Sequence, residues 1–199
     1  RRIALALAVV LLVPAAAQAA TTPVDLNDFF ADPTVSVAID GMSATMEEEA
    51  GFSPILLSND PGLDPIALAA KIGGIWQTLE FEFLFSEAAG HDDEFGAYIL
   101  DPVTGDSFGP AYEFYTDTST VGFVTVSIDL TGLTDPIGLQ FQLDALPGDP
   151  GVGSIVEILD VRTVDNSAPA VPLPPALFMG LGLLASCAAV RRIRRRSAA

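Results

Sequence analysis

The chain has 199 residues, half of them hydrophobic, and a formal net charge of −17 at pH 7. All 26 acidic residues lie between Asp25 and Asp165, where Lys71 and Arg162 are the only basic residues. This charge excludes nucleic acid as a partner, because phosphates would repel the acidic middle of the chain. Strongly apolar segments separate the acidic residues, so we expect an ordered domain rather than a disordered one.

The N-terminal stretch has the order of parts found in a secretory signal peptide. Arg1 and Arg2 precede the apolar run 3–13, and the small-residue site Ala17-Gln18-Ala19 follows. We therefore predict a helical signal peptide over residues 1–19, removed by signal peptidase after Ala19. A twin-arginine export signal and an uncleaved membrane anchor are the alternatives, although 11 apolar residues are few for a membrane span. Residue 1 is not methionine, so we expect further residues to precede it.

Residues 20–165 are enough for one domain with a sizeable core. Their hydrophobic pattern has mostly a period of 2, which indicates half-buried strands. We predict a hairpin formed by residues 35–39 and 42–46, because the dipeptide Asp40-Gly41 between them is typical of a tight turn. Prolines and glycines interrupt the stretch that follows, where we expect one short helical turn at 65–72.

The second half of the domain repeats the strand pattern more clearly. We predict strands over residues 79–85, 95–100, 123–130, 138–143 and 155–164. Apolar residues at alternate positions should face the core, namely Leu79, Phe81, Phe83, Phe85, Val124, Val126, Ile128, Leu130, Leu139, Phe141 and Leu143. The segment from Asp101 to Asp106 contains proline and glycine and is expected to form a hairpin turn.

Seven or eight short strands, with almost no helical periodicity, predict an all-β fold. The expected architecture is an antiparallel β-sandwich, and we favour a jelly roll. The hairpin around Asp40-Gly41, the strand that ends in 127–130, and the strands 139–143 and 154–161 are similar to those of carbohydrate-binding-module-like jelly rolls. This resemblance implies a structural ion between the N-terminal segment and the last strand.

The C-terminal end combines four short parts. A linker at 166–170 leads to a proline-rich motif at 171–177, an apolar run at 176–190 and an arginine cluster at 191–196. The apolar run has 15 uncharged residues, or 20 when counted from Val171, against the about 20 that cross a bilayer. We therefore predict one transmembrane helix whose C-terminal end lies in the cytoplasm, because arginines are retained on that side.

This tail resembles the PEP-CTERM class of bacterial sorting signals, in the variant whose motif reads Val-Pro-Leu-Pro. The motif residues are Val171, Pro172, Leu173, Pro174, Ala176 and Leu177, and the basic residues are Arg191, Arg192, Arg194, Arg195 and Arg196. Pro175 departs from the variant, since many relatives carry alanine there. The resemblance implies processing by an exosortase in the inner membrane, during export to the cell surface or an exopolysaccharide matrix. An ordinary single-pass anchor that is not cleaved is the alternative.

Few residues suggest catalysis. Glu80 and Glu82 lie two apart on one predicted strand, so their carboxylates share a face at about 7 Å, a separation that a glycosidase can use. His91 is the only histidine, and no nucleophile motif accompanies it. Tyrosines and a tryptophan could instead form a sugar-stacking platform, and the candidates are Trp76, Tyr98, Tyr112 and Tyr115.

Calcium is the cofactor that the composition favours, because hard cations take oxygen ligands. The only cysteine, Cys187, lies in the apolar tail, so the exported part forms no disulfide and depends on packing or bound metal. Acidic loop residues are available at Glu47–Glu49, Asp92–Glu94, Asp101 with Asp106, and Asp144 with Asp149. From the jelly-roll resemblance we choose Asp160 with Asp25 or Glu47 as the calcium ligands to test first.

Two classes of function follow from these patterns. The favoured one is a non-catalytic exported protein of the envelope or extracellular matrix, with a structural or glycan-adhesive β-sandwich. The alternative is a secreted hydrolase that acts on polysaccharide, which requires an acid and a base or nucleophile in one cleft. The expected partners are the secretion machinery, an exosortase-type enzyme and polysaccharide.

Overall fold

A computed structural model describes residues 19–60, 63, 72, 78–133, 136–145 and 152–165. These residues belong to a compact unit that extends from Ala19 to Ser167. The predicted signal-peptide helix, the linker, and the sorting tail with its transmembrane helix lie outside the described residues, as does the predicted helical turn apart from Ile72. Within the described ranges, no helix combines the length and the apolar character needed for a membrane span.

The described residues form two antiparallel sheets, of six and five strands. The strands are β1 (Ala20–Pro23), β2 (Phe30–Ala31), β3 (Val35–Val37), β4 (Ser43–Glu47), β5 (Ile55–Ser58), β6 (Thr78–Ser86), β7 (Asp93–Leu100), β8 (Glu113–Thr116), β9 (Val124–Asp129), β10 (Gly138–Ala145) and β11 (Ile155–Asp165). Two short 3₁₀ helices, η1 (Leu26–Asp28) and η3 (Pro110–Tyr112), lie in the connections. The predicted β-sandwich is confirmed.

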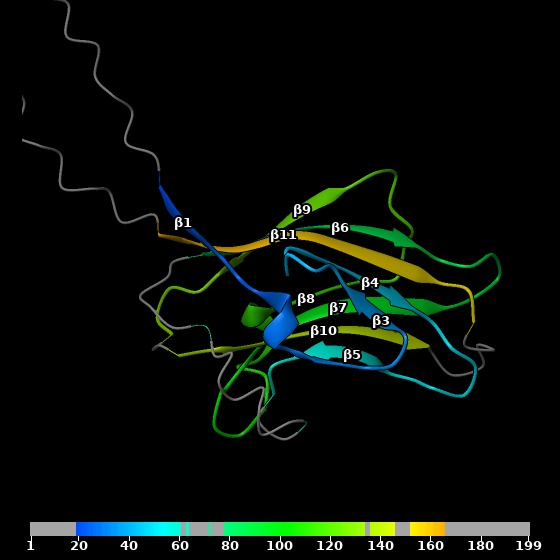
Figure 1. The fold of residues 1–199 in the computed structure, drawn as a ribbon, viewed down its shortest axis with the longest axis horizontal. Helices are drawn as coiled ribbons and strands as arrows, with labels where there is room; N and C mark the ends of the chain where they lie inside the picture. The colour runs from blue at the N-terminus through cyan, green and yellow to red at the C-terminus, as the bar shows by residue number, and fades with distance from the viewer. Residues whose placement is uncertain are drawn as a thin grey trace, which may run out of the picture. The chain divides into compact units, whose positions relative to one another are not determined.

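The chain passes repeatedly from one sheet to the other. The six-stranded sheet has the order β3-β4-β11-β6-β9, with β1 beside β11, and the five-stranded sheet has the order β2-β5-β10-β7-β8 (Figure 1). From β4 onward, successive strands alternate between the sheets except for the hairpin of β7 and β8. Apart from the β3–β4 and β7–β8 hairpins, the strands that pair within each sheet are therefore not consecutive in the chain.

Phenylalanine rings fill the space between the sheets. Phe81 of β6 meets Phe141 of β10 edge-on, with ring centroids 5.2 Å apart, and Phe83 lies 5.1 Å from Phe95 of β7. The alternation predicted for β6 and β10 is confirmed, since each inward residue there is at most 1% exposed. Val124 differs from its prediction and is 40% exposed, because β9 is an edge strand and its inward face is only partly covered.

The predicted hairpin of β3 and β4 is present, with Val35 opposite Met46. Gly41 in its turn has a φ of 69°, and an added Cβ would lie 1.9 Å from Asp25 Oδ1. Only glycine therefore fits both the backbone conformation and the close approach of this carboxylate. Four strands were not predicted, namely β1, β2, β5 and β8.

The last strand, β11, changes partner at a β-bulge. Its first part, from Ile155 to Leu159, pairs with β4, and its last part, from Arg162 to Asp165, pairs with β1. The register with β6 shifts between Leu159 and Arg162, where Asp160 has a φ of 55°. The bulge thus lets one strand join two partners end to end, and it places Ala20 opposite Asp165.

Candidate functional site

Two tyrosines share the outer face of the five-stranded sheet. In the ladders of this sheet Gly96 lies opposite both Gln142 and Tyr115, and Tyr98 lies opposite both Gln140 and Glu113. Cross-strand partners point to the same side of a sheet. We call the resulting surface the tyrosine face; its members are Glu94, Tyr98, Glu113, Tyr115, Gln140, Gln142 and Asp144.

The ring of Tyr98 lies along its own strand and covers Gly96. A Cβ atom at position 96 would be only 2.6 Å from the Tyr98 hydroxyl oxygen and 2.7 Å from the ring. Burial raises the pKa of the Tyr98 phenol, and the nearby carboxylates of Glu94, Glu113 and Asp144 raise it further. Tyr98 therefore presents a neutral, half-buried ring, while its neighbour Tyr115 is 64% exposed.

Polar side chains flank the rings in an ordered row. Gln140 Nε2 donates to Gln142 Oε1 at 3.1 Å, and Gln142 Nε2 donates to Asp144 Oδ2 at 3.4 Å. Asp144 lies opposite Glu94, whose pKa is raised by burial and then by Asp144 and Asp117. Such a surface offers apolar ring area beside hydrogen-bonding amides and carboxylates, which is what an amphipathic ligand such as a sugar requires.

Of the three predicted aromatic residues that the structure describes, Tyr98 and Tyr115 lie together. Tyr112 lies in η3, where it packs against the hydrophobic core and meets Phe108 edge-on at 6.0 Å between centroids. It therefore belongs to the core boundary rather than to the tyrosine face. Trp76 lies outside the described residues.

The acidic pair Glu80 and Glu82 lies on the outer face of the other sheet. Glu80 is bound to Arg162, with Nη2 to Oε2 at 2.8 Å and Nε to Oε2 at 3.1 Å. This hydrogen bond is the main reason that the pKa of Arg162 is raised. Glu82 lies opposite Leu159 and Thr125. The sequence pattern did not indicate that a guanidinium neutralises one carboxylate of the pair.

The residues chosen for calcium are not all brought together. Asp160 forms an ion pair with Arg162 at the bulge, and its backbone N–H donates to Met42. Asp25 follows Val24, whose N–H donates to Val161 O at 2.9 Å, and Asp25 Oδ1 accepts from the Asn27 N–H at 3.0 Å. Glu47 pairs with Ile155 at the start of β11, which places it about 16 Å along the strand from Asp160. One calcium ion cannot contact both Asp160 and Glu47 at this separation, whereas calcium binding by Asp160 with Asp25 stays a prediction.

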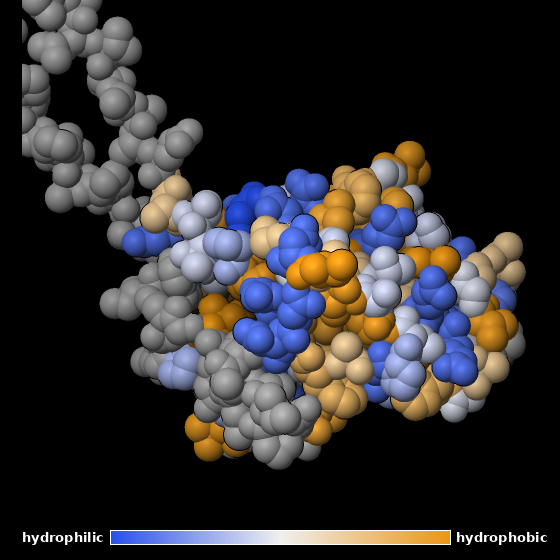
Figure 2. Space-filling model, viewed as in Figure 1, coloured by the Kyte–Doolittle hydropathy of each residue, from blue (hydrophilic) through white to orange (hydrophobic). Residues whose placement is uncertain are grey.

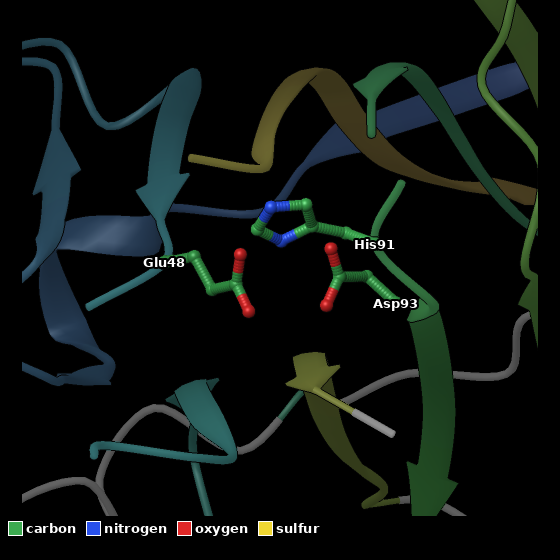
Figure 3. A group of neighbouring side chains, drawn as sticks. All are labelled: Glu48, His91 and Asp93. Carbon is green, nitrogen blue, oxygen red and sulfur yellow. The ribbon is translucent and has the colours of Figure 1, made fainter. Parts of the chain in front are cut away.

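A different acidic cluster lies at one end of the sandwich, between the two sheets. Ligand atoms of Glu48, His91 and Asp93 all lie within 4.8 Å of one another, and Figure 3 shows the imidazole and both carboxylates turned toward a common centre. The sequence placed these residues in two separate acidic runs. Strand alternation could have linked them, because Glu48 continues the inward phase of Ala44 and Met46. Asp93 likewise has the inward phase of β7.

The comparisons with known proteins show limited likeness. No family model and no curated protein matches the chain. Among solved structures, the chain is similar to a carbohydrate-binding module, TmCBM27, described for specific mannan recognition; the identity is 10%, the TM-score is 0.43, and 75% of this chain and 98% of that one are covered. A human norovirus GI.7 virus-like particle is similar with 14% identity and a TM-score of 0.29, over 81% of this chain and 39% of that one.

Proposed function

We propose that this chain is an exported, non-catalytic protein whose β-sandwich binds polysaccharide through the tyrosine face. The observation that carries this proposal is the placement of Tyr98 and Tyr115 on adjacent strands, beside the row of Gln140, Gln142 and Asp144. A pyranose ring has an apolar face that can lie on an aromatic ring and hydroxyl groups that bind amides and carboxylates.

The geometry of the face favours an extended ligand over a small enclosed one. Tyr98 is held against the sheet by its contact with Gly96, so little side-chain entropy remains to be lost on binding. The polar row runs along β10 rather than around a closed pocket. Hydrophilic and hydrophobic groups are also interspersed over the described surface seen in Figure 2.

In this proposal the C-terminal tail delivers the domain to the cell surface or extracellular matrix through exosortase processing. Support for this part comes from the sequence alone, from the motif 171–177 followed by the arginine cluster 191–196. Mass spectrometry of the mature C-terminus tests it. A mature chain ending before the arginine cluster is expected, and a chain that retains Ala199 would favour the uncleaved anchor.

A glycan array probed with the purified full chain tests binding. Wild-type protein should bind at least one polysaccharide, and Tyr98→Ala or Tyr115→Ala should each weaken binding about tenfold, equal to about 1.4 kcal/mol. Phe123→Ala is the matched control, because this aromatic residue is 45% exposed and directly precedes β9 of the other sheet. Binding that is absent from wild type, or unchanged in both tyrosine variants, would overturn the proposal.

The same array tests two further expectations. It is run with calcium and with a chelator, so that an ion requirement separates from glycan contact. Release of reducing sugar by the wild-type chain, lost in Glu94→Gln, would instead support the hydrolase alternative, because Glu94 faces Asp144 and has a raised pKa.

A further inference from the structure

The cluster of Glu48, His91 and Asp93 joins parts of the chain that are distant in sequence. Glu48 directly follows β4 in one sheet, whereas Asp93 begins β7 in the other. Glu48 is 9% exposed and Asp93 is 0% exposed, so both carboxylates are largely removed from water. Two carboxylates at this separation repel one another, and a cation bound between them would relieve that repulsion.

The two oxygens of the Asp93 carboxylate differ in their hydrogen bonds. Asp93 Oδ2 accepts a hydrogen bond of 2.5 Å from Ser154 Oγ, and this hydroxyl oxygen in turn accepts from the Ala88 N–H at 2.7 Å. Asp93 Oδ1 is buried and has no hydrogen-bond partner among the described residues. A fully buried carboxylate oxygen of this kind is costly unless a hydrogen bond or a metal ion satisfies it.

We propose that Glu48, His91 and Asp93 bind a divalent transition-metal cation of the Zn²⁺ class. An imidazole nitrogen with two carboxylate oxygens suits zinc-like ions, whereas calcium takes oxygen ligands only. Small rotations of the side chains would bring all three ligand atoms to about 2.0–2.2 Å from one central ion. Ser154 would hold Asp93 in position through its hydroxyl group.

The ion would act as a clamp between the sheets. It would connect the segment after β4 with the start of β7, and through Ser154 it would also fix the start of β11. A cation that binds only the folded chain raises its stability with increasing concentration. This inference is independent of the tyrosine face, because the cluster lies between the sheets and the face lies outside them.

The test uses the full chain, purified without a histidine tag and in a Cys187→Ser background that removes the only thiol. After treatment with a chelator, the protein is titrated with Zn²⁺ by calorimetry and its thermal unfolding is followed with and without the ion. We expect one zinc ion per chain and an increase in melting temperature. Asp93→Asn should weaken zinc binding at least tenfold, whereas Asp92→Asn and Glu49→Gln, matched changes at exposed neighbours, should retain it.

The absorption spectrum of bound Co²⁺ provides a second readout. It would not depend on His91 if this residue only stabilised the fold. His91 is the only histidine, so a Co²⁺ spectrum with nitrogen coordination can come from no other imidazole. His91 is partly exposed, so His91→Gln should fold even where Asp93→Asn does not. Loss of the cobalt spectrum in folded His91→Gln supports the site. Absence of zinc binding by the wild-type chain, or equal binding by the His91 and control variants, would overturn it.

Discussion

The ring of Tyr98 lies directly over Gly96, two residues earlier on β7. A methyl group at position 96 would occupy the space of the ring, so Gly96→Ala should push Tyr98 away from the sheet. Since the obstacle is the end of one side chain rather than backbone, the fold should survive. We expect weaker glycan binding with a circular dichroism spectrum like that of the wild type.

The phenol of Tyr98 provides a check that does not depend on any glycan. Burial is the main cause of its raised pKa, so lifting the ring into water should bring the pKa down toward its ordinary value of 10.0. Ultraviolet titration of phenolate formation measures this, with Tyr98→Phe assigning the signal. An unchanged titration in Gly96→Ala would show that the ring had not moved.

Glu94 should make stability depend on pH. Its folded-state pKa is raised above the ordinary 4.5, so the folded chain holds this proton more tightly than the unfolded chain does. Ionising Glu94 therefore costs folding free energy; the cost appears as pH rises through 4.5 and is complete above the folded-state pKa. Glu94→Gln should be more stable than wild type at neutral pH, and the difference should vanish below 4.5.

Urea unfolding of Glu94→Gln and of the wild type, at neutral pH and below pH 4.5, measures this difference in stability. Asp144→Asn gives a second, independent check, because Asp144 is the charge that contributes most to raising the pKa of Glu94. It should lower that pKa without removing the titrating group. A neutral-pH midpoint for Glu94→Gln below that of the wild type would contradict the assignment.

The phenylalanine layer should account for much of the stability. Phe141 is fully buried and contacts Phe81 across the sandwich. Phe141→Ala would leave a cavity between the sheets and should cost about 3–5 kcal/mol of unfolding free energy. Phe123→Ala removes the same group at an exposed position and is the control for chemical denaturation. Similar midpoints for the two variants would mean that the sheets do not pack as described.

The bulge at Asp160 should be sensitive to side-chain shape. Its φ of 55° is tolerated by asparagine but not by β-branched residues. Asp160→Asn and Asp160→Val both remove the charge that faces Arg162. Valine should nevertheless be less stable than asparagine by about 1–2 kcal/mol, because only valine is strained there. Thermal unfolding of the two variants side by side measures the difference, and equal stability would refute the strain.

The fold was largely predictable wherever both periodicity and packing agreed. In β6, phenylalanines alternate with glutamates, and each lies on the expected side. By contrast, Ile55–Ser58 follows a proline and is apolar without alternation, and Glu113–Thr116 has only four residues, two polar and two aromatic. Such edge or buried segments become strands because a neighbouring strand supplies their hydrogen bonds. The sequence of the segment alone does not show which strand will supply these hydrogen bonds.

The candidate sites depended on register, which the sequence does not specify. Composition makes Tyr98 and Tyr115 candidates, but only the pairing of Gly96 with Tyr115 places them on one face. Tyr112 had the same composition signal and packs against the core instead. To predict that Glu48 and Asp93 lie close together, one must know that both side chains face inward and that their strands lie in opposite sheets.

The pairing of β1 with the end of β11 determines how the domain responds to mechanical force. Ala20 and Asp165 are directly opposite partners, so tension applied between the two ends acts on one terminal pair at a time. The ladder would then open like a zipper from that pair toward the bulge. A pull on Asp165 against a polymer held on the opposite sheet would instead load many strands in parallel, and the domain should resist it far better.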